Sequence, residues 1–425
     1  MSRSLEQWLA YQQGTHSLSI DLSLERVRDV AARLGLLEKR CLVVVVAGTN
    51  GKGSTAATLA ALLQSCGLRV GLFTSPHLVR YNERVQIDGA AASDAALVAA
   101  FERIEAARGA VTLTFFEYNT LAALELFRHA ALGAMVLEVG LGGRLDAVNI
   151  IDADVAVLCS IGIDHREWLG STLEQIGAEK AGVFRRGQNV VLGNVAMPAS
   201  VWRTARELEC RVWTAERDFS WRIHGDGSGA EAWDYRSEPC TLLDLPAPAL
   251  AGAVQYRNSS SALTAMQLLA VAGACDQRRI ARGLTSVALP GRFQVVPGDV
   301  EWILDVAHNE PAAAVLAGAL AARPCEGKSF AVAGMLADKD VAAVASTLDP
   351  LVAHWLLAGI DGEPRGLDAR ALQARLPPLR GTIELATDTT AACARARALS
   401  SPHDRVIVFG SFYVVGPALQ WLGLY

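Results

Sequence analysis

The chain has 425 residues and carries 39 lysines and arginines against 44 aspartates and glutamates, which gives a net charge of −5. This length predicts two or three domains, and a composition of 51% hydrophobic and 20% charged residues excludes an intrinsically disordered chain. The mildly acidic balance argues against a nucleic-acid-binding protein, which would usually present a basic surface. Only five of the cationic residues are lysines, so a lysine inside a motif deserves notice.

The first two thirds of the chain alternate between short β-branched runs and helical stretches rich in Ala and Leu. The predicted strands cover residues 42–47, 68–73, 134–139, 155–161 and 190–192. The predicted helices cover residues 54–66, 94–107, 118–130 and 173–184. Apolar strands joined through helices indicate a parallel sheet buried on both faces, which is a three-layer α/β domain. Residues 213–250 are rich in aromatic residues, Gly, Pro and Asp, and they predict a small β appendage on this domain.

A Pro-Gly pair at positions 290–291 breaks regular structure and marks a domain boundary. Beyond it the alternation restarts, with predicted strands at 302–307, 330–334, 355–358 and 406–409 and predicted helices at 310–322 and 341–348. The sequence therefore predicts a first domain at 1–289, a hinge linker at 290–294 and a smaller Rossmann-like α/β domain at 295–425.

The eight cysteines are scattered and include no C-x-x-C pair. This spacing predicts neither a disulfide framework nor a zinc site, and it favours a reducing compartment. A long charge-free stretch, residues 258–275, contains several hydroxyl and amide side chains, so it predicts a buried helix rather than a bilayer span. We therefore expect a cytoplasmic protein without a membrane partner.

Residues 43–54, with the sequence VVVVAGTNGKGS, run from a buried strand through a Gly-rich turn into a helix. Such a turn lets backbone N–H groups surround a phosphate, and the helix N-terminus adds partial positive charge. Lys52 would neutralise phosphate oxygens, and Ser54 or Thr55 could bind Mg²⁺. The match to G-x-x-x-x-G-K-[ST] is imperfect, because Val46 replaces the first Gly and Gly53 follows Lys52. The pattern still predicts a P-loop, with an ordinary Gly-rich turn as the alternative.

Other chemically active side chains follow later strands. Glu138 ends the strand at 134–139, where nucleoside triphosphatases hold Mg²⁺, although a solvated acid is the alternative. His165 is a metal ligand or a hydrogen-bonded loop residue. Lys180 lies in the last turn of a predicted helix, where a cation complements the helix dipole, so a structural role fits.

Together these segments resemble one family, the dihydrofolate synthase/folylpolyglutamate synthase branch of the Mur-ligase ATPases. The matching segments span most of the chain in the family's order: GTNGKGS (48–54), TSPHLVRYNERV (74–85), TFFEYNTLAAL (114–124), LEVGLGGRLDAVNI (137–150), IGIDHREWLG (161–170), EKAGVF (179–184), LPGRFQ (289–294), DVAHN (305–309) and GMLADKD (334–340). Mur cell-wall ligases carry a further domain before the P-loop, for which the 47 residues ahead of Gly48 are too few.

The resemblance implies a role for each matched residue. The implied ATP-binding residues are Thr49, Asn50, Gly51, Lys52, Gly53, Ser54, Asn258, Arg292 and Asp305. The implied ligands of two Mg²⁺ ions are Ser54, Ser75, Glu138 and His165. The implied catalytic residues are Lys52, Glu138, His165 and Lys180. The resemblance also implies that Lys180 is carbamylated to N6-carboxylysine. It would then be an anion near the metal ions and not a cation at a helix end. The implied substrate-binding residues are Asp21, Leu22, Ser23, Leu24, Thr114, Phe115, Phe116, Glu117, Leu145, Asp146 and Ala147 for dihydropteroate, and His308 and Ser411 for glutamate.

The implied reaction uses ATP to join L-glutamate to 7,8-dihydropteroate and to reduced folates through an acyl phosphate. The segment IDLSLERV (20–27) is similar to the pterin-side segment of bacterial enzymes that accept dihydropteroate, and it favours a bifunctional enzyme. Two alternatives stay open: a folylpolyglutamate synthase that cannot use dihydropteroate, and a P-loop nucleotide switch without ligase activity. We expect a monomer, and the resemblance gives Lys339 no role.

Overall fold

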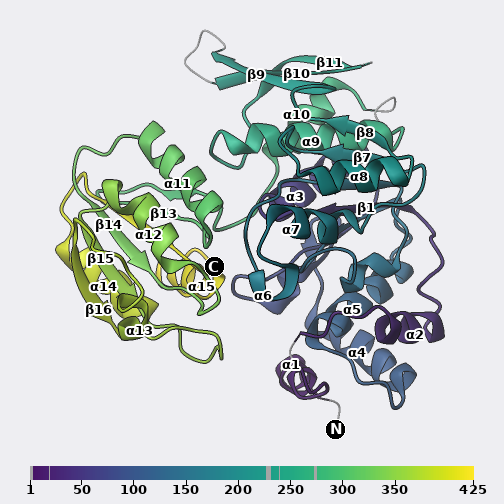
Figure 1. Ribbon diagram of the computed structural model, residues 1–425, viewed down its shortest axis with the longest axis horizontal. Coiled ribbons are helices and arrows are strands. Elements are labelled where there is room, and N and C mark those ends of the chain that lie inside the picture. Colours follow the sequence, from purple (N-terminus) through teal and green to yellow (C-terminus); the bar gives the residue numbers. More distant parts are fainter. Residues whose placement is uncertain (1–2, 19, 226–230, 239, 272–274) are drawn as a thin grey trace.

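The computed structural model describes residues 3–18, 20–225, 231–238, 240–271 and 275–425. In this part of the chain the strands form an eight-stranded sheet, a three-stranded sheet and a six-stranded sheet (Figure 1). The eight-stranded and three-stranded sheets belong to one body, at the right and top of the figure, and the six-stranded sheet forms a second body beside it.

The eight-stranded sheet has the order β4-β3-β2-β5-β1-β6-β7-β8. Its strands are β1 (Leu42–Ala47), β2 (Val70–Phe73), β3 (Val85–Ile87), β4 (Ala90–Ala91), β5 (Ala134–Glu138), β6 (Val155–Leu158), β7 (Asn189–Leu192) and β8 (Arg211–Thr214). The six strands from β2 to β8 are parallel, whereas β3 and β4 pair antiparallel at one edge. Because the central strands are covered on both faces, they read as uninterrupted apolar runs.

Helices cover both faces of this sheet. They are α1 (Leu5–Gln13), α2 (Glu25–Arg33), α3 (Lys52–Ser65), α4 (Asp94–Arg108), α5 (Phe115–His129), α6 (Arg166–Leu169), α7 (Leu173–Ala181), α8 (Ala199–Glu207), α9 (Val254–Leu268) and α10 (Gln277–Thr285), with 3-10 turns η1 (Tyr81–Arg84) and η2 (Ala147–Ile150). Helices α4 and α5 pack on one face, and α3 and α9 pack on the other.

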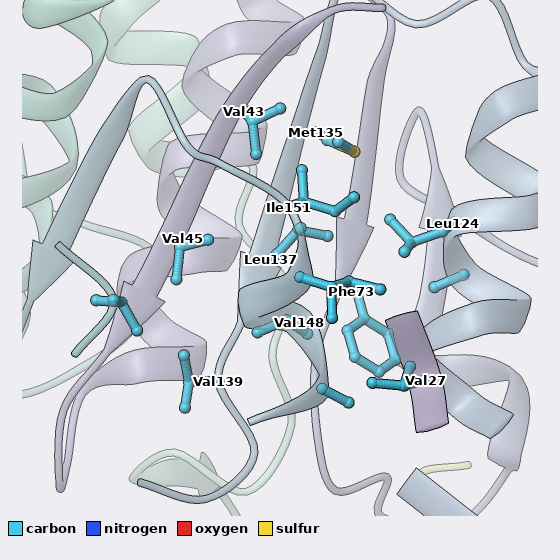
Figure 2. Close-up of a cluster of buried hydrophobic side chains, with 14 of the residues drawn as sticks. Val27, Val43, Val45, Phe73, Leu124, Met135, Leu137, Val139, Val148 and Ile151 are labelled. Atoms are coloured by element: carbon cyan, nitrogen blue, oxygen red, sulfur yellow. The ribbon is translucent and has the colours of Figure 1, made fainter. Parts of the chain in front are cut away.

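Strand β1 contributes to both cores, which fixes the loop that follows it. Val43 and Val45 point into the core under α5, where Figure 2 shows them beside Met135 and Leu137 of β5. The alternate residues Val44 and Val46 point into the core under α3 and α9. Both faces of the strand are therefore anchored immediately before the Gly-rich turn.

The predicted β segment 213–250 divides between two sheets. Trp213 and Thr214 belong to β8 at the edge of the large sheet, so the prediction is wrong for them. Within the remaining described residues, β9 (Phe219–Gly225), β10 (Glu231–Ser237) and β11 (Thr241–Pro246) form an antiparallel sheet. Trp233 and Tyr235 of β10 pack into the core under α9, which holds this sheet on the first body.

The six-stranded sheet has the order β12-β13-β17-β14-β15-β16. Its strands are β12 (Gln294–Val296), β13 (Glu301–Leu304), β14 (Ser329–Ala333), β15 (His354–Ala358), β16 (Thr382–Ala386) and β17 (Arg405–Phe409). Its helices are α11 (Glu310–Ala322), α12 (Val341–Leu348), α13 (Ala369–Gln373), α14 (Thr389–Leu399) and α15 (Phe412–Trp421), with the 3-10 turn η4 (Asp349–Leu351). Only β12 runs antiparallel within the sheet. The predicted fold class, a three-layer parallel-sheet domain with a smaller Rossmann-like α/β domain, is confirmed.

One cysteine pair corrects the sequence analysis. Cys66, at the end of α3, forms a disulfide with Cys275, which lies just before α10, across a Cα–Cα distance of 5.1 Å. The expectation that the cysteines form no disulfide is wrong for this pair, because a separation of 209 residues leaves no spacing signal. Among the described residues, no helix combines the length and the apolar character that a bilayer crossing requires.

Candidate active site

A cavity of about 650 Å³ lies where the carboxyl ends of the first sheet face the second body. Fifteen predicted site residues line it: Thr49, Asn50, Gly51, Lys52, Gly53, Ser54, Ser75, Glu138, His165, Lys180, Asn258, Arg292, Asp305, His308 and Ser411. Parallel strands end at the same edge of a sheet, and this explains why segments far apart in sequence meet there.

The Gly-rich turn is bound to its neighbours on both sides. Thr49 Oγ1 donates to the Gly162 carbonyl oxygen at 3.1 Å and accepts from the Gly162 N–H at 2.9 Å. Gly51 has a φ of +87°, and a Cβ there would lie 2.9 Å from Asn258 Oδ1, so a larger residue would be both strained and crowded. Among the residues that the structure describes, no side chain caps the N-terminus of α3, so its first N–H groups are left for an anion.

Two lysines converge on one backbone oxygen of this turn. Lys52 Nζ donates to the carbonyl oxygens of Gly48 and Thr49, each at 3.1 Å. Lys180 Nζ, reaching from α7, donates to the same Gly48 oxygen at 3.0 Å. Lys180 is only 5% exposed, and burial, helped by the charge of Lys52, lowers the pKa of its ammonium group to about 7. A substantial fraction of the amine is therefore neutral, and hence nucleophilic, near neutral pH.

Glu138 is a buried carboxylate at the end of β5. It is 4% exposed, and its Oε2 accepts from the Ser75 N–H at 3.0 Å. Among the described residues, no Lys, Arg or His nitrogen lies within 4 Å of this carboxylate. Burial raises its pKa, and the charge of Lys52 only partly opposes that rise. A buried carboxylate without an ion-pair partner is suited to a bound cation.

Ser54, Ser75 and His165 line the same cavity as that carboxylate. The Ser54 hydroxyl lies in the first turn of α3, and Ser75 follows β2. Burial lowers the pKa of the His165 imidazole to about 4, so the ring stays neutral at physiological pH, the form that binds metals. Two hydroxyls, a carboxylate and an imidazole therefore offer ligands that a divalent cation accepts.

The second body contributes the opposite wall of the cavity. Asp305 Oδ2 accepts from the Phe293 N–H and Oδ1 from the Ala307 N–H, both at 2.8 Å. Burial raises the pKa of Asp305, and the nearby guanidinium of Arg292 counteracts that rise. Ser411 caps α15 by accepting from the Tyr413 N–H. These residues lie at the start of the second sheet and at its strand ends.

The predicted dihydropteroate residues lie outside this cavity. They are Asp21, Leu22, Ser23, Leu24, Thr114, Phe115, Phe116, Glu117, Leu145, Asp146 and Ala147. Arg26 joins two of their segments, since its Nη1 is 2.7 Å from Asp21 Oδ2 and its Nη2 is 3.3 Å from Glu117 Oε1. Glu117 also forms a capping box with Thr114 at the start of α5. Asp146 caps η2, and burial raises its pKa to about 6.

Three residues without an assigned role in the sequence analysis meet between the two bodies. Asn309 and Lys339 each contact Asp164, although the three residues lie in separate segments. The available signal was the matched segment GMLADKD in a chain with few lysines, but only the packing of the two bodies reveals the partner of Lys339.

Comparisons with known proteins cover nearly the whole chain. The model of the Mur ligase middle domain matches residues 46–242, and that of the Mur ligase glutamate ligase domain matches residues 291–412. The chain is 42% identical over 416 residues to the dihydrofolate synthase/folylpolyglutamate synthase of Escherichia coli strain K12, covering 98% of this chain and 95% of that protein.

Solved structures agree with these matches. E. coli FolC in complex with DHPP and ADP has a TM-score of 0.93 and 40% identity, covering 99% of this chain and 98% of that one. A bifunctional folylpolyglutamate synthase/dihydrofolate synthase with Mn, AMPPNP and L-glutamate bound has a TM-score of 0.89 and 41% identity. The match covers 100% of this chain and 99% of that one.

Proposed function

The chain belongs to the Mur ligase family, within its dihydrofolate synthase/folylpolyglutamate synthase enzymes, and is therefore an ATP-dependent glutamate ligase; on this premise we propose the role of each part of its site. The carboxylate of 7,8-dihydropteroate, or the γ-carboxylate of a reduced folate, attacks the γ-phosphorus of ATP, and ADP leaves. The amine of L-glutamate then displaces phosphate from the resulting acyl phosphate and forms the amide. The convergence of Lys52 and Lys180 on the Gly48 oxygen, beside the buried Glu138, supports this assignment best.

The Gly-rich turn binds the phosphates of ATP. The free N–H groups at the start of α3 point toward them, and Lys52 turns from the Gly48 and Thr49 oxygens to the phosphate oxygens. Two anions must approach each other in the first step, so this neutralisation contributes directly to the rate. Asn258, Arg292 and Asp305 contact the nucleotide from the rim of the cavity, a role supported by their place in its lining.

Ser54, Ser75, Glu138 and His165 would hold two Mg²⁺ ions. When bound, the ions supply charge neutralisation between the attacking carboxylate and the γ-phosphate. Lys180 as a carbamate would present an anion to this site, and its lowered pKa supports the modification, because only a neutral amine adds CO₂. The modification would also remove the repulsion between two cations that share one carbonyl oxygen.

We assign the first domain to residues 1–289, the hinge to 290–294 and the glutamate-ligase domain to 295–425. The break between the two family-model matches, at 242 and 291, supports a boundary in this region. Acyl phosphates react with water, so closing the two domains over the site protects the intermediate. One chain lines the cavity from both sides, which supports a monomeric enzyme, acting in the cytoplasm where ATP and glutamate are supplied.

The pterin end of the substrate lies against Asp21–Leu24, Thr114–Glu117 and Leu145–Ala147. Ion pairs of Arg26 with Asp21 and Glu117 support this grouping, because they hold two of these segments together. Glutamate enters near His308 and Ser411, which line the cavity from the second domain.

The decisive experiment supplies dihydropteroate and tetrahydrofolate separately, each with L-glutamate and MgATP. ADP release is measured together with the mass of the product. Glutamylation of both substrates supports the bifunctional ligase, and glutamylation of tetrahydrofolate alone supports a folylpolyglutamate synthase. ADP release that needs neither a pteroate nor glutamate would instead support a nucleotide switch.

A further inference from the structure

Asp164 is a residue of the first domain that contacts several side chains of the second domain. It follows β6, and its side chain is 8% exposed. Lys339 Nζ lies 2.6 Å from Asp164 Oδ1, and Asn309 Nδ2 donates to Oδ2 at 2.9 Å. His308 Nε2 lies 3.5 Å from the same Oδ2. Three side chains from two loops of the second domain thus meet one carboxylate of the first.

Asn309 extends this contact to the Gly-rich turn. Its amide exchanges two hydrogen bonds with the Asn50 amide, at 2.9 and 3.1 Å. Asn309 Oδ1 also caps α11 by accepting from the Ala312 N–H, so the side chain is fixed to the second domain. A shift of that domain therefore acts directly on the loop that holds the phosphates.

The chain contains a second lysine pair of equal length that serves for comparison. Lys39 Nζ lies 2.6 Å from Asp154 Oδ1, but both residues belong to the first domain and their side chains are 43% and 30% exposed. The Lys339 side chain is 5% exposed. Charges attract more strongly away from water, and removing one partner of a buried pair leaves the other uncompensated. An exposed pair contributes little.

The pair also lies between two cavities. Asp164 and Lys339 line both the site cavity and a second cavity of about 710 Å³, which Arg166 and Arg375 line as well. The pair is therefore part of the wall that separates the reacting groups from that second space.

We propose that Lys339 is a positioning residue of the ligase reaction, whose ion pair with Asp164 holds the second domain closed on the Gly-rich turn. This rests on the function proposed above. When the domains separate, water hydrates both charges, so the pair adds little to the stability of either domain alone. The attraction between the two charges therefore stabilises only the closed arrangement of the domains. That arrangement excludes water from the acyl phosphate.

The test compares Lys339→Met, Lys339→Arg and Asp164→Asn with the wild type and with Lys39→Met as the matched control. Small-angle scattering with MgATP reports the separation of the domains and requires no turnover. Kinetics report kcat, the KM for each substrate and the ratio of phosphate released to glutamate incorporated. Thermal unfolding confirms that each variant is folded.

Lys339→Met should enlarge the radius of gyration with MgATP, raise the ratio of phosphate to product and lower kcat by about 10²-fold, as a misplacement of about 1 Å does. Asp164→Asn should change the same readouts at least as strongly, because Asn309 and His308 also face this carboxylate, and the double variant should be no worse than Asp164→Asn alone. Lys339→Arg should restore much of the activity, and Lys39→Met should match the wild type.

A rise confined to the KM for glutamate, with unchanged scattering and an unchanged phosphate ratio, would show that Lys339 binds the amino acid and would overturn the proposal. Scattering and a phosphate ratio in Asp164→Asn like those of the wild type would overturn it too. If Lys339→Met does not fold, Asp164→Asn and Lys339→Arg test the proposal through the same measurements of scattering, kcat and phosphate ratio. Failure of the wild type to glutamylate any pteroate would instead refute the proposed function.

Discussion

The strand-end loops of the first sheet and those of the second meet in one cavity but are held in different ways. In the first sheet, Thr49 is bound to Gly162, Glu138 to Ser75 and Lys180 to Gly48, all within one domain. In the second sheet, Asn309 and Lys339 find partners across the interface. Folding of one domain therefore sets the first group, whereas Asn309 and Lys339 meet their partners in the first domain only when the domains are closed.

The largest expected effect is at the centre of the first region. Lys52→Ala removes the charge that we propose neutralises the phosphates, so kcat should fall by at least about 10³-fold. Scattering with MgATP should still show closed domains if the two regions act separately. ADP formation is the measurement, with the exposed Lys328→Ala as the control. Activity near that of the wild type would contradict the P-loop assignment.

Lys180→Met should separate function from stability within the same region. It should lower kcat by about 10²-fold through loss of the proposed carbamate anion. Burial lowers the pKa of the unmodified Lys180 to about 7. Above that pH and up to the ordinary lysine pKa, the unfolded chain binds a proton that the folded chain lacks, so the stability of the unmodified wild type rises with pH. Below pH 7 the penalty for burying the charge is complete.

In CO₂-free buffer, Lys180→Met should therefore unfold at a higher temperature than the wild type below pH 7. The difference should shrink as the pH approaches 10. Bicarbonate should stabilise only the wild type, and native mass spectrometry should show an added CO₂ on it. A difference in unfolding temperature that does not vary with pH would contradict the burial of a titrating amine at this position.

Asp305→Asn probes the second region with a smaller expected effect. The carboxylate accepts from two backbone N–H groups, that of Phe293 in the hinge and that of Ala307 in the second domain. A hydrogen bond to a charged group is worth about 1.5–3 kcal/mol, so the KM for ATP should rise by about 10-fold or more. The KM for ATP is measured by steady-state kinetics at saturating glutamate. An unchanged KM for ATP would remove Asp305 from the nucleotide contacts.

The contrast between the two regions also explains what could be predicted from the sequence. The Gly-rich turn and Glu138 follow apolar strands, and parallel strands bring their ends together, so local pattern was enough to group them. The sequence pattern alone indicated that Lys180 is a cation at a helix end. Its position in a helix does not show that its side chain is buried. The partner of Lys339 lies 175 residues away, across a domain interface, and the Cys66–Cys275 disulfide spans 209 residues. No local pattern records such contacts.

The smallest expected effect concerns a contact that lies across the same interface but outside the cavity. Tyr425 Oη donates to Glu83 Oε1 at 2.6 Å, and the ring is half exposed. Glu83 also accepts from the N–H groups of Leu78, Val79 and Arg80, so it remains satisfied when the hydroxyl is lost. Tyr425→Phe should therefore lower the free energy of unfolding by at most about 1 kcal/mol and leave kcat unchanged.

Glu83→Ala should cost more than Tyr425→Phe in the same denaturant titration, because three backbone N–H groups of the loop after Ser75 lose their acceptor. If Tyr425→Phe instead opened the domains in scattering with MgATP, closure would depend on this outer contact as well. Lys339 would then share the role that its burial against Asp164 assigns to it. Unchanged scattering would confine closure to the contacts around Asp164, where the second domain reaches the Gly-rich turn.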